Sequence, residues 1–221
     1  MTAAALFDVD GTLLDTTYLH ALAWSDALEQ YGHRLPMARI HGAVGMGGDQ
    51  LLEHLLPADR DRDDDARISA AHQALYARFW PRLRPFDGAA ELLRRCASLG
   101  QRVVLASSAS GRDLSVMRRV LDADPAIWAA TSADDVAASK PAPDLVQAAL
   151  AKAEVPCTQA VFIGDTKWDV EAAVRAEVPC IAVRTGGAAP CALRSAGAVE
   201  VHEDVAALLA GLADSMLGRI S

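Results

Sequence analysis

Residues 3–15 have the sequence AAALFDVDGTLLD, and this stretch decides how the rest of the chain is interpreted. Its apolar start, residues 3–7, is typical of a buried strand in a parallel sheet. Asp8 and Asp10 follow at a spacing of two, which in an extended segment directs both carboxylates to one side and Val9 to the other. Two carboxylates at close range repel unless a cation lies between them or one keeps a proton. Because open α/β sheets bind ligands beyond the carboxyl ends of their strands, we predict a functional site here.

The composition limits the classes of protein to which the chain can belong. Its 221 residues suit one domain, or one core domain with an insertion, and 52% of them are hydrophobic. The net charge of −8 argues against nucleic acid as a partner. No apolar run reaches the ~20 residues that span a bilayer, and no basic-then-apolar leader opens the sequence. We therefore expect a cytoplasmic protein without a membrane partner, whose oligomeric state, monomer or homodimer, stays open.

Residues 16–84 have apolar residues at helical spacing and no strand pattern. The predicted helices span residues 19–31, 50–56 and 66–80, with Asp49 as the N-cap of the second. A glycine-rich turn, Gly45-Met46-Gly47-Gly48, precedes that second helix.

From residue 85 onward, strand patterns alternate with helical patterns, which indicates a parallel sheet with right-handed crossovers. We therefore predict a Rossmann-like α/β core from residues 1–15 and 85–221, interrupted by an all-helical insertion over residues 16–84. The predicted strands of this second part span residues 102–106, 129–133, 160–163, 180–183 and 199–201. The predicted helices span residues 89–99, 112–121, 143–153, 170–176 and 205–217.

Two later positions carry side chains that suit phosphate chemistry. Ser107 follows the strand predicted over residues 102–106, where a hydroxyl and free N–H groups can hold phosphate oxygens, although serine-rich loops after strands are common. Lys140 lies in the segment SKPAPD, residues 139–144. An ammonium there could offset the repulsion between a carboxylate nucleophile and a phosphate. A surface lysine before a helix is the alternative.

A second acidic motif follows the strand predicted to precede Gly164. Gly164 allows a sharp turn that delivers Asp165 to the sheet edge that carries Asp8, and Asp169 can face the same point from a first helical turn. Mg²⁺ prefers carboxylates, carbonyls, waters and phosphate oxygens as ligands. We predict that Asp8 and Asp165 bind Mg²⁺. Asp169 would bind it directly or through water; the alternative is a plain helix N-cap at Asp165 with Asp169 exposed.

These motifs resemble the signatures of a known family. The segment FDVDGTL, residues 7–13, resembles the first signature of the haloacid dehalogenase superfamily in its phosphatase form. Ser107, the KPAPD segment (140–144) and the GDTKWD segment (164–169) resemble the later signatures in the same order. The KPAPD segment resembles the third signature of the phosphoglycolate phosphatase and β-phosphoglucomutase-like branch. This resemblance implies a fold with an inserted helical cap and a phosphoryl-transfer reaction.

The resemblance also implies roles for individual residues. Asp8 would be the nucleophile that becomes an aspartyl-phosphate, and Lys140 the catalytic lysine. Asp10 would be the general acid/base, and its backbone carbonyl would also bind Mg²⁺. The positions expected to contact the phosphate are Gly11, Thr12, Ser107 and Ser108.

The helical insertion resembles the cap that closes over the site and excludes water in this superfamily. The segment DTTYLHALAW, residues 15–24, is similar to the β-phosphoglucomutase-like branch, where a histidine near the hinge helps gate acid/base chemistry. His20 is the candidate for this role, and a half-buried packing histidine is the alternative. Gly47 and Gly48 lie in the loop that members present to substrate, where they could offer backbone N–H groups or simply form a turn.

We therefore expect a Mg²⁺-dependent phosphatase that acts on a small phosphorylated metabolite, with a β-phosphoglucomutase-like phosphohexose mutase as the alternative. The mutase branch carries an arginine near the loop where this chain has Gly47 and Gly48, which argues against that alternative. The dehalogenase branch lacks a counterpart of Asp10. The phosphonoacetaldehyde hydrolase branch uses a cap lysine, and residues 16–84 contain none. The identity of the substrate stays open.

Overall fold

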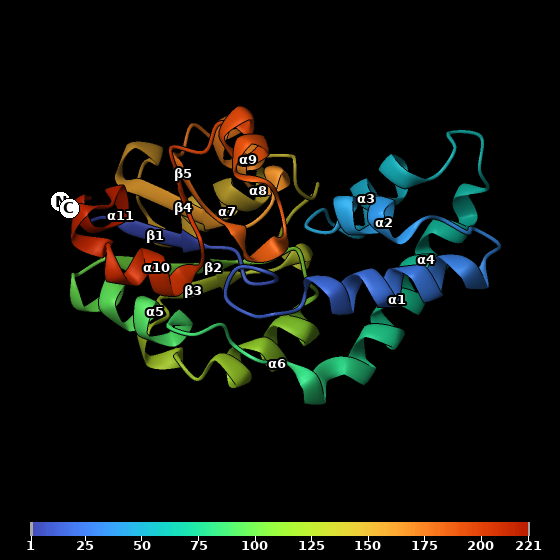
Figure 1. The fold of residues 1–221 in the computed structure, drawn as a ribbon, viewed down its shortest axis with the longest axis horizontal. Helices are drawn as coiled ribbons and strands as arrows, with labels where there is room; N and C mark the ends of the chain where they lie inside the picture. Colours follow the sequence, from blue (N-terminus) through green and yellow to red (C-terminus); the bar gives the residue numbers. More distant parts are fainter. Residues whose placement is uncertain (1, 221) are drawn as a thin grey trace.

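The computed structural model describes residues 2–220 and contains a parallel sheet with helices on both faces (Figure 1). The strands pair in the order β3-β2-β1-β4-β5-β6, and all pairs are parallel. This is the order of a doubly wound α/β fold, which confirms the predicted Rossmann-like core. The strands are β1 (Ala4–Phe7), β2 (Arg102–Ala106), β3 (Ala129–Thr131), β4 (Ala160–Gly164), β5 (Cys180–Val183) and β6 (Glu200–His202).

The central strand β1 shows why the opening run is continuously apolar. Ala5 and Phe7 belong to a core cluster on one face of the sheet, whereas Ala4 and Leu6 belong to a second cluster on the other face. All four side chains are fully buried, because helices cover both faces of the sheet. The first face packs against α5 (Ala89–Ser98), α6 (Gly111–Leu121) and α10 (Val205–Ala210). The second packs against α7 (Asp144–Ala153), α8 (Lys167–Arg175) and α9 (Pro190–Ala196).

Residues 16–84, which we call the helical segment, project from the carboxyl edge of the sheet (Figure 1). They form a third core cluster of their own, which includes Trp24, Leu28, Leu52 and Ile68. The helices of this segment are α1 (Thr17–Gln30), α2 (Met37–Ala43), α3 (Gly48–Leu55) and α4 (Asp65–Tyr76).

The two connections between the helical segment and the sheet lie side by side. The Asp15 amide donates to the Arg84 carbonyl at 3.0 Å, and the Phe86 amide donates to the Leu13 carbonyl at 2.9 Å. The chain therefore leaves the core and returns to it at one hydrogen-bonded point.

Several predicted helix boundaries are wrong, each for a local reason. Asp49 is not the N-cap of α3, because Gly47 takes the extended capping conformation and the helix begins at Gly48. The helix predicted to reach residue 80 ends at Tyr76 and continues as a 3₁₀ turn that contains a proline.

The C-terminal helix predicted over residues 205–217 is interrupted. It divides into α10, a 3₁₀ turn over Leu212–Asp214, and α11 (Met216–Arg219). The break occurs because the Ser215 hydroxyl accepts a hydrogen bond from the Gly218 amide and so caps a new helix. Within residues 2–220 no helix combines the length and the apolar character that crossing a bilayer requires.

Candidate active site

The carboxyl edge of the sheet brings the predicted acidic residues together. Asp8 follows β1 and Asp165 follows β4, and these strands are neighbours with Phe7 opposite Ile163. The Asp8 amide continues the ladder by donating to the Ile163 carbonyl at 2.9 Å. Two carboxylates that are 157 positions apart along the chain therefore reach the same edge.

Lys140 lies between two of these carboxylates. Its Nζ atom is 2.6 Å from Oδ1 of Asp8 and 2.7 Å from Oδ1 of Asp169. Burial lowers the pKa of Lys140, but the charges of Asp169 and Asp8 outweigh this effect and raise it above the usual value. Lys140 is therefore a permanently charged ammonium in a site that is closed to solvent.

Thr12 joins the two acidic strand ends. Its hydroxyl lies 3.0 Å from Oδ2 of Asp8 and 2.8 Å from Oδ1 of Asp165, so it can donate to one of them at a time. Burial raises the pKa of Asp8 to about 7, with further increases from Asp169 and Asp10 that Lys140 only partly offsets. Burial, followed by the charges of Asp169 and Asp8, raises the pKa of Asp165 well above its usual value. Without a further cation, this group of carboxylates is electrostatically unfavourable.

The donor set fits a divalent cation that prefers oxygen ligands. Asp8, Asp165 and Asp169 each offer an oxygen within 4.8 Å of the others. Oδ2 of Asp165 is buried and has no hydrogen-bond partner, which is unusual for a carboxylate oxygen. Both oxygens of Asp169 already have partners, because Oδ1 contacts Lys140 and Oδ2 accepts from the Thr166 amide and hydroxyl at 3.0 and 2.6 Å. Asp165 is therefore the carboxylate best placed to bind a metal directly, and Oδ2 of Asp8 can join it when the Thr12 hydroxyl donates to Asp165 instead.

Gly11 is required by this close packing. Its φ of 81° is in the left-handed region, and a Cβ atom would lie 2.3 Å from Oδ2 of Asp165 and 2.5 Å from the Thr17 hydroxyl. Gly11 thus keeps open the space around the unpartnered oxygen.

Asp10 faces the helical segment rather than the carboxylate group. Its Oδ1 accepts from the Thr16 hydroxyl at 2.7 Å and lies 3.0 Å from Nε2 of His20. Burial raises the pKa of Asp10, but His20 and Thr16 lower it by more, so that it lies below the usual value. The Nδ1 atom of His20 lies 3.2 Å from Nε2 of His72 on α4. His20 therefore connects Asp10 to a second histidine.

His72 is a site residue that the sequence analysis missed. Its ring stacks on Trp24 with centroids 3.9 Å apart, and burial lowers the pKa of His72 well below the usual value. The available signal was its position four residues before Tyr76, whose ring stacks on His20 at 3.8 Å. The spacing alone does not show that His72 and Tyr76 both contact His20, because these contacts depend on how α1 packs against α4.

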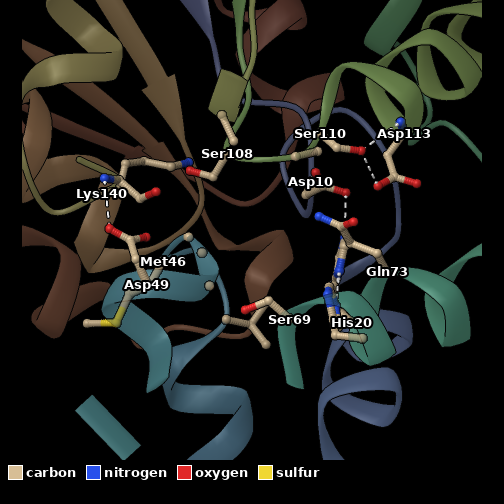
Figure 2. Close-up of a pocket in the computed structure, with 18 of the residues that line it drawn as sticks. Asp10, His20, Met46, Asp49, Ser69, Gln73, Ser108, Ser110, Asp113 and Lys140 are labelled. Atoms are coloured by element: carbon tan, nitrogen blue, oxygen red, sulfur yellow. Dashed lines mark hydrogen bonds and ion pairs between the residues drawn. The ribbon is translucent and has the colours of Figure 1, made fainter. Parts of the chain in front are cut away.

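The loop after β2 presents Ser108, not Ser107, to the cavity. Ser107 is fully buried, accepts from the Ala109 amide at 3.0 Å, and lies 3.4 Å from Oδ2 of Asp10. The Ser108 hydroxyl lines the cavity and has no partner. Figure 2 shows Ser108 beside Lys140, where a phosphate oxygen could accept its hydrogen bond.

A cavity of about 280 Å³ lies between the sheet edge and the helical segment. Gly47 and Gly48 line it, and Gly47 packs against the core so closely that a Cβ atom would lie 2.0 Å from Oγ of Ser139. Oδ2 of Asp49 accepts from the Ser139 amide at 3.4 Å. The glycine-rich loop therefore closes one side of the cavity against the loop that carries Lys140 (Figure 2).

Comparison with known proteins agrees with this geometry. Residues 2–177 match the family model described as haloacid dehalogenase-like hydrolase. The phosphoglycolate phosphatase of Rhodospirillum rubrum is 32% identical over 94% of this chain and 90% of its own length. The crystal structure of a hydrolase from Pseudomonas syringae superposes with a TM-score of 0.91 at 32% identity, over 96% of this chain and 99% of the other. The chain belongs to the haloacid dehalogenase-like hydrolase family.

Within that family the chain falls in the phosphoglycolate phosphatase-like branch, as the KPAPD segment indicated. A similar sequence also occurs as one part of a much larger protein. SUPPRESSOR OF QUENCHING 1, a chloroplastic protein of Arabidopsis thaliana, is 29% identical over 92% of this chain, which spans only 20% of that protein.

Proposed function

We propose that the chain is a Mg²⁺-dependent phosphatase that hydrolyses a small phosphate monoester through an aspartyl-phosphate on Asp8. The observation that carries this proposal is the buried contact of Asp8 with Lys140, next to the unpartnered oxygen of Asp165. A nucleophilic carboxylate beside an ammonium and a vacant oxygen ligand is the arrangement that attack on a phosphate dianion requires.

In the first step, a carboxylate oxygen of Asp8 attacks phosphorus and the alcohol leaves. Lys140 offsets the repulsion between the carboxylate and the phosphate, and the Ser108 hydroxyl donates to a phosphate oxygen. In the second step, water attacks phosphorus and Asp8 is released as a carboxylate. The bound ester therefore exchanges its alcohol for water in two displacements.

Asp10 is proposed to move the proton in both steps. In the free enzyme its low pKa keeps it ionised, but a phosphate dianion close by would raise that pKa and favour the protonated form. Protonated Asp10 would donate to the leaving oxygen, and ionised Asp10 would then accept a proton from the attacking water. Contact with His20 orients the carboxyl and lowers the pKa of Asp10, which favours its ionised form.

Asp8, the Asp10 carbonyl and Asp165 would hold Mg²⁺, with Asp169 held in place by Lys140 and Thr166. Bound there, the cation would neutralise carboxylate charge and act as a Lewis acid for the phosphoryl oxygens. The fit rests on the vacant Asp165 oxygen and on a donor set made only of oxygens.

The helical segment is proposed to act as a cap that opens for substrate and closes for reaction. Its cavity wall includes Gly47 and Gly48. A β-phosphoglucomutase-like reaction would need a cation in this wall to hold a second phosphate. Among the described residues that line the cavity, Lys140 is the one lysine or arginine. We therefore favour the phosphatase over the mutase. Incubation with a sugar 1-phosphate distinguishes them, because a mutase yields the 6-phosphate and a phosphatase yields free phosphate.

The test uses p-nitrophenyl phosphate with Mg²⁺, with and without a chelator. Wild type and Asp15→Asn, which changes an exposed aspartate of the same segment, should turn over, whereas Asp8→Asn should be inactive and folded. Acid-quenched wild type should carry one phosphoryl group on the peptide that contains Asp8. Near-native turnover by Asp8→Asn would overturn the proposal.

A further inference from the structure

We infer that the alcohol released from the phosphate ester carries no negative charge, and that it is a hydroxyl-bearing or amine-bearing group. This inference rests on the proposed phosphatase function and concerns the end of the cavity away from Asp8. The phosphoglycolate named for the Rhodospirillum rubrum relative has a carboxylate at that end, so the inference separates this chain from that relative in substrate.

The cavity wall beyond the reacting phosphate has acidic groups and no basic partner. Asp49, Asp113 and Asp134 line it, whereas Lys140 is the one lysine or arginine among the described lining residues. Lys140 is occupied by Asp8 and Asp169. The part of the cavity that would receive the alcohol therefore presents three carboxylates without a cation.

The nearby arginines are held elsewhere. The Arg112 guanidinium lies over the Trp80 ring, 4.6 Å from its centroid, and does not line the cavity. On the helical segment, Arg60 pairs with Asp65 at 2.8 Å and with Glu53 at 3.0 Å.

Within the cavity, a carboxylate or second phosphate on the substrate would thus find no lysine or arginine other than Lys140. His20 and His72 also line the cavity, but His20 contacts Asp10 and His72 stacks on Trp24.

The three carboxylates differ in what they can do. Asp113 is buried and accepts from the Trp80 indole at 3.1 Å and from the Ser110 hydroxyl at 2.7 Å. Both of its oxygens therefore have partners, and Asp113 influences a substrate through its charge rather than through a hydrogen bond. Asp49 and Asp134 are exposed at the rim and accept only backbone or neutral amide hydrogens. Neither has a cationic partner, and both can accept further hydrogen bonds from substrate.

The remaining wall is suited to an uncharged carbon skeleton with polar substituents. Trp24 and Met46 supply apolar surface, whereas Ser69 and Gln73 supply hydroxyl and amide groups (Figure 2). Such walls bind hydroxyl and amino groups by hydrogen bonds, and the carboxylates add attraction for an ammonium. The carboxylates also repel a substrate that carries a negative charge at this end, so the cavity can reject an anionic ester of the same size.

Three esters of equal length test the inference: 2-phosphoglycolate, 2-hydroxyethyl phosphate and 2-aminoethyl phosphate. We expect kcat/KM for the hydroxyl and amino esters to exceed that for 2-phosphoglycolate by about tenfold or more. In the double variant Asp49→Asn/Asp134→Asn, kcat/KM for 2-phosphoglycolate should rise relative to that for the other two esters. Asp59→Asn/Asp87→Asn changes two exposed aspartates outside the cavity by the same charge, and should leave the ratio where it is.

A second variant keeps the test independent of the double substitution. Met46→Arg adds a cation to the wall and should raise kcat/KM for 2-phosphoglycolate relative to the other two esters. Preference of wild type for 2-phosphoglycolate would overturn the inference while p-nitrophenyl phosphate turnover upheld the phosphatase function. Loss of turnover with every ester, p-nitrophenyl phosphate included, would overturn the phosphatase function itself and the inference with it.

Discussion

The Nζ atom of Lys140 lies 2.6 Å from Oδ1 of Asp8, and both side chains are almost completely shielded from solvent. Neither group could be buried alone at neutral pH without a large desolvation cost. The pair therefore serves two purposes, because it permits a carboxylate nucleophile in a closed site and neutralises part of the charge that an incoming phosphate meets.

Removal of this ammonium should affect both stability and turnover. We expect Lys140→Met to lower the free energy of unfolding by about 3–5 kcal/mol in metal-free buffer, because Asp8 and Asp169 lose their cation. Turnover should fall by about 10²–10³-fold. Urea unfolding and p-nitrophenyl phosphate assays measure these effects. Lys167→Met, at an exposed lysine, is the control, and equal losses in both variants would contradict the assigned role.

Asp165 should determine metal affinity. Replacing it by asparagine removes the charge beside the vacant oxygen position, so we expect Mg²⁺ to bind at least about tenfold more weakly. The increase in melting temperature on titration with Mg²⁺ measures this without any substrate. Glu177→Gln, at an exposed carboxylate, should keep the wild-type titration. An unchanged midpoint in Asp165→Asn would place the metal elsewhere.

The raised pKa of Asp8 gives stability a distinct pH dependence without metal. Asp8 has a pKa of about 7 when folded and 3.8 when unfolded, so between these values the folded protein retains a proton that the unfolded chain has released. Stability from this group is thus present at low pH and is lost as pH rises toward 7, at about 1.4 kcal/mol per pH unit. In chelator, wild type should lose stability relative to Asp8→Asn from pH 4 to pH 7 on denaturant titration. An unfolding free energy of wild type that rises relative to that of Asp8→Asn between pH 4 and pH 7 would contradict the sign.

Closure of the helical segment should depend on the missing side chain of Gly47. A Cβ at this position would meet Oγ of Ser139 at 2.0 Å, so Gly47→Ala should hold the cavity open and lower kcat/KM by about tenfold or more. Adding Ser139→Gly should restore most of the activity, because it removes the obstructing atoms. Gly42→Ala, at a helical glycine with open space around it, should have no such effect. A lack of rescue in the double variant would show that the contact is not what matters.

His72 should act on catalysis through His20. His72→Phe removes the nitrogen that lies 3.2 Å from Nδ1 of His20 but keeps an aromatic ring against Trp24, so we expect kcat to fall by about tenfold with little change in KM. Steady-state kinetics with p-nitrophenyl phosphate measure both constants. His54→Phe is the control at an exposed histidine. Equal kcat values for His72→Phe and wild type would reduce His72 to a packing residue.

Much of the core could be predicted from the sequence because its signals are local. The apolar run of residues 4–7 and the carboxylates that follow it indicate a buried strand and a sheet-edge site, and the alternating pattern after residue 85 indicates a parallel sheet. The meeting of Asp8 and Asp165 could be predicted as well, because both follow strands of one parallel sheet, but contacts made by loops could not. The position of Lys140 between Asp8 and Asp169 depends on the path of the loop before α7, which no spacing encodes.

Helix ends were less predictable because they depend on competing caps. Asp49 has the chemistry of an N-cap, but Gly47 and Gly48 precede it and allow the helix to start earlier. In the loop after β2, adjacent serines cannot be ranked from sequence, since a single turn decides that Ser107 is buried and Ser108 faces the cavity.

The bond from the Asp15 amide to the Arg84 carbonyl has a consequence for how such enzymes diversify. Because residues 16–84 begin and end at one hydrogen-bonded connection, they can be replaced as a unit while the sheet and its catalytic residues keep their positions. Related enzymes can thus gain new substrates by exchange of the helical segment, whereas the residues at the sheet edge are inherited unchanged.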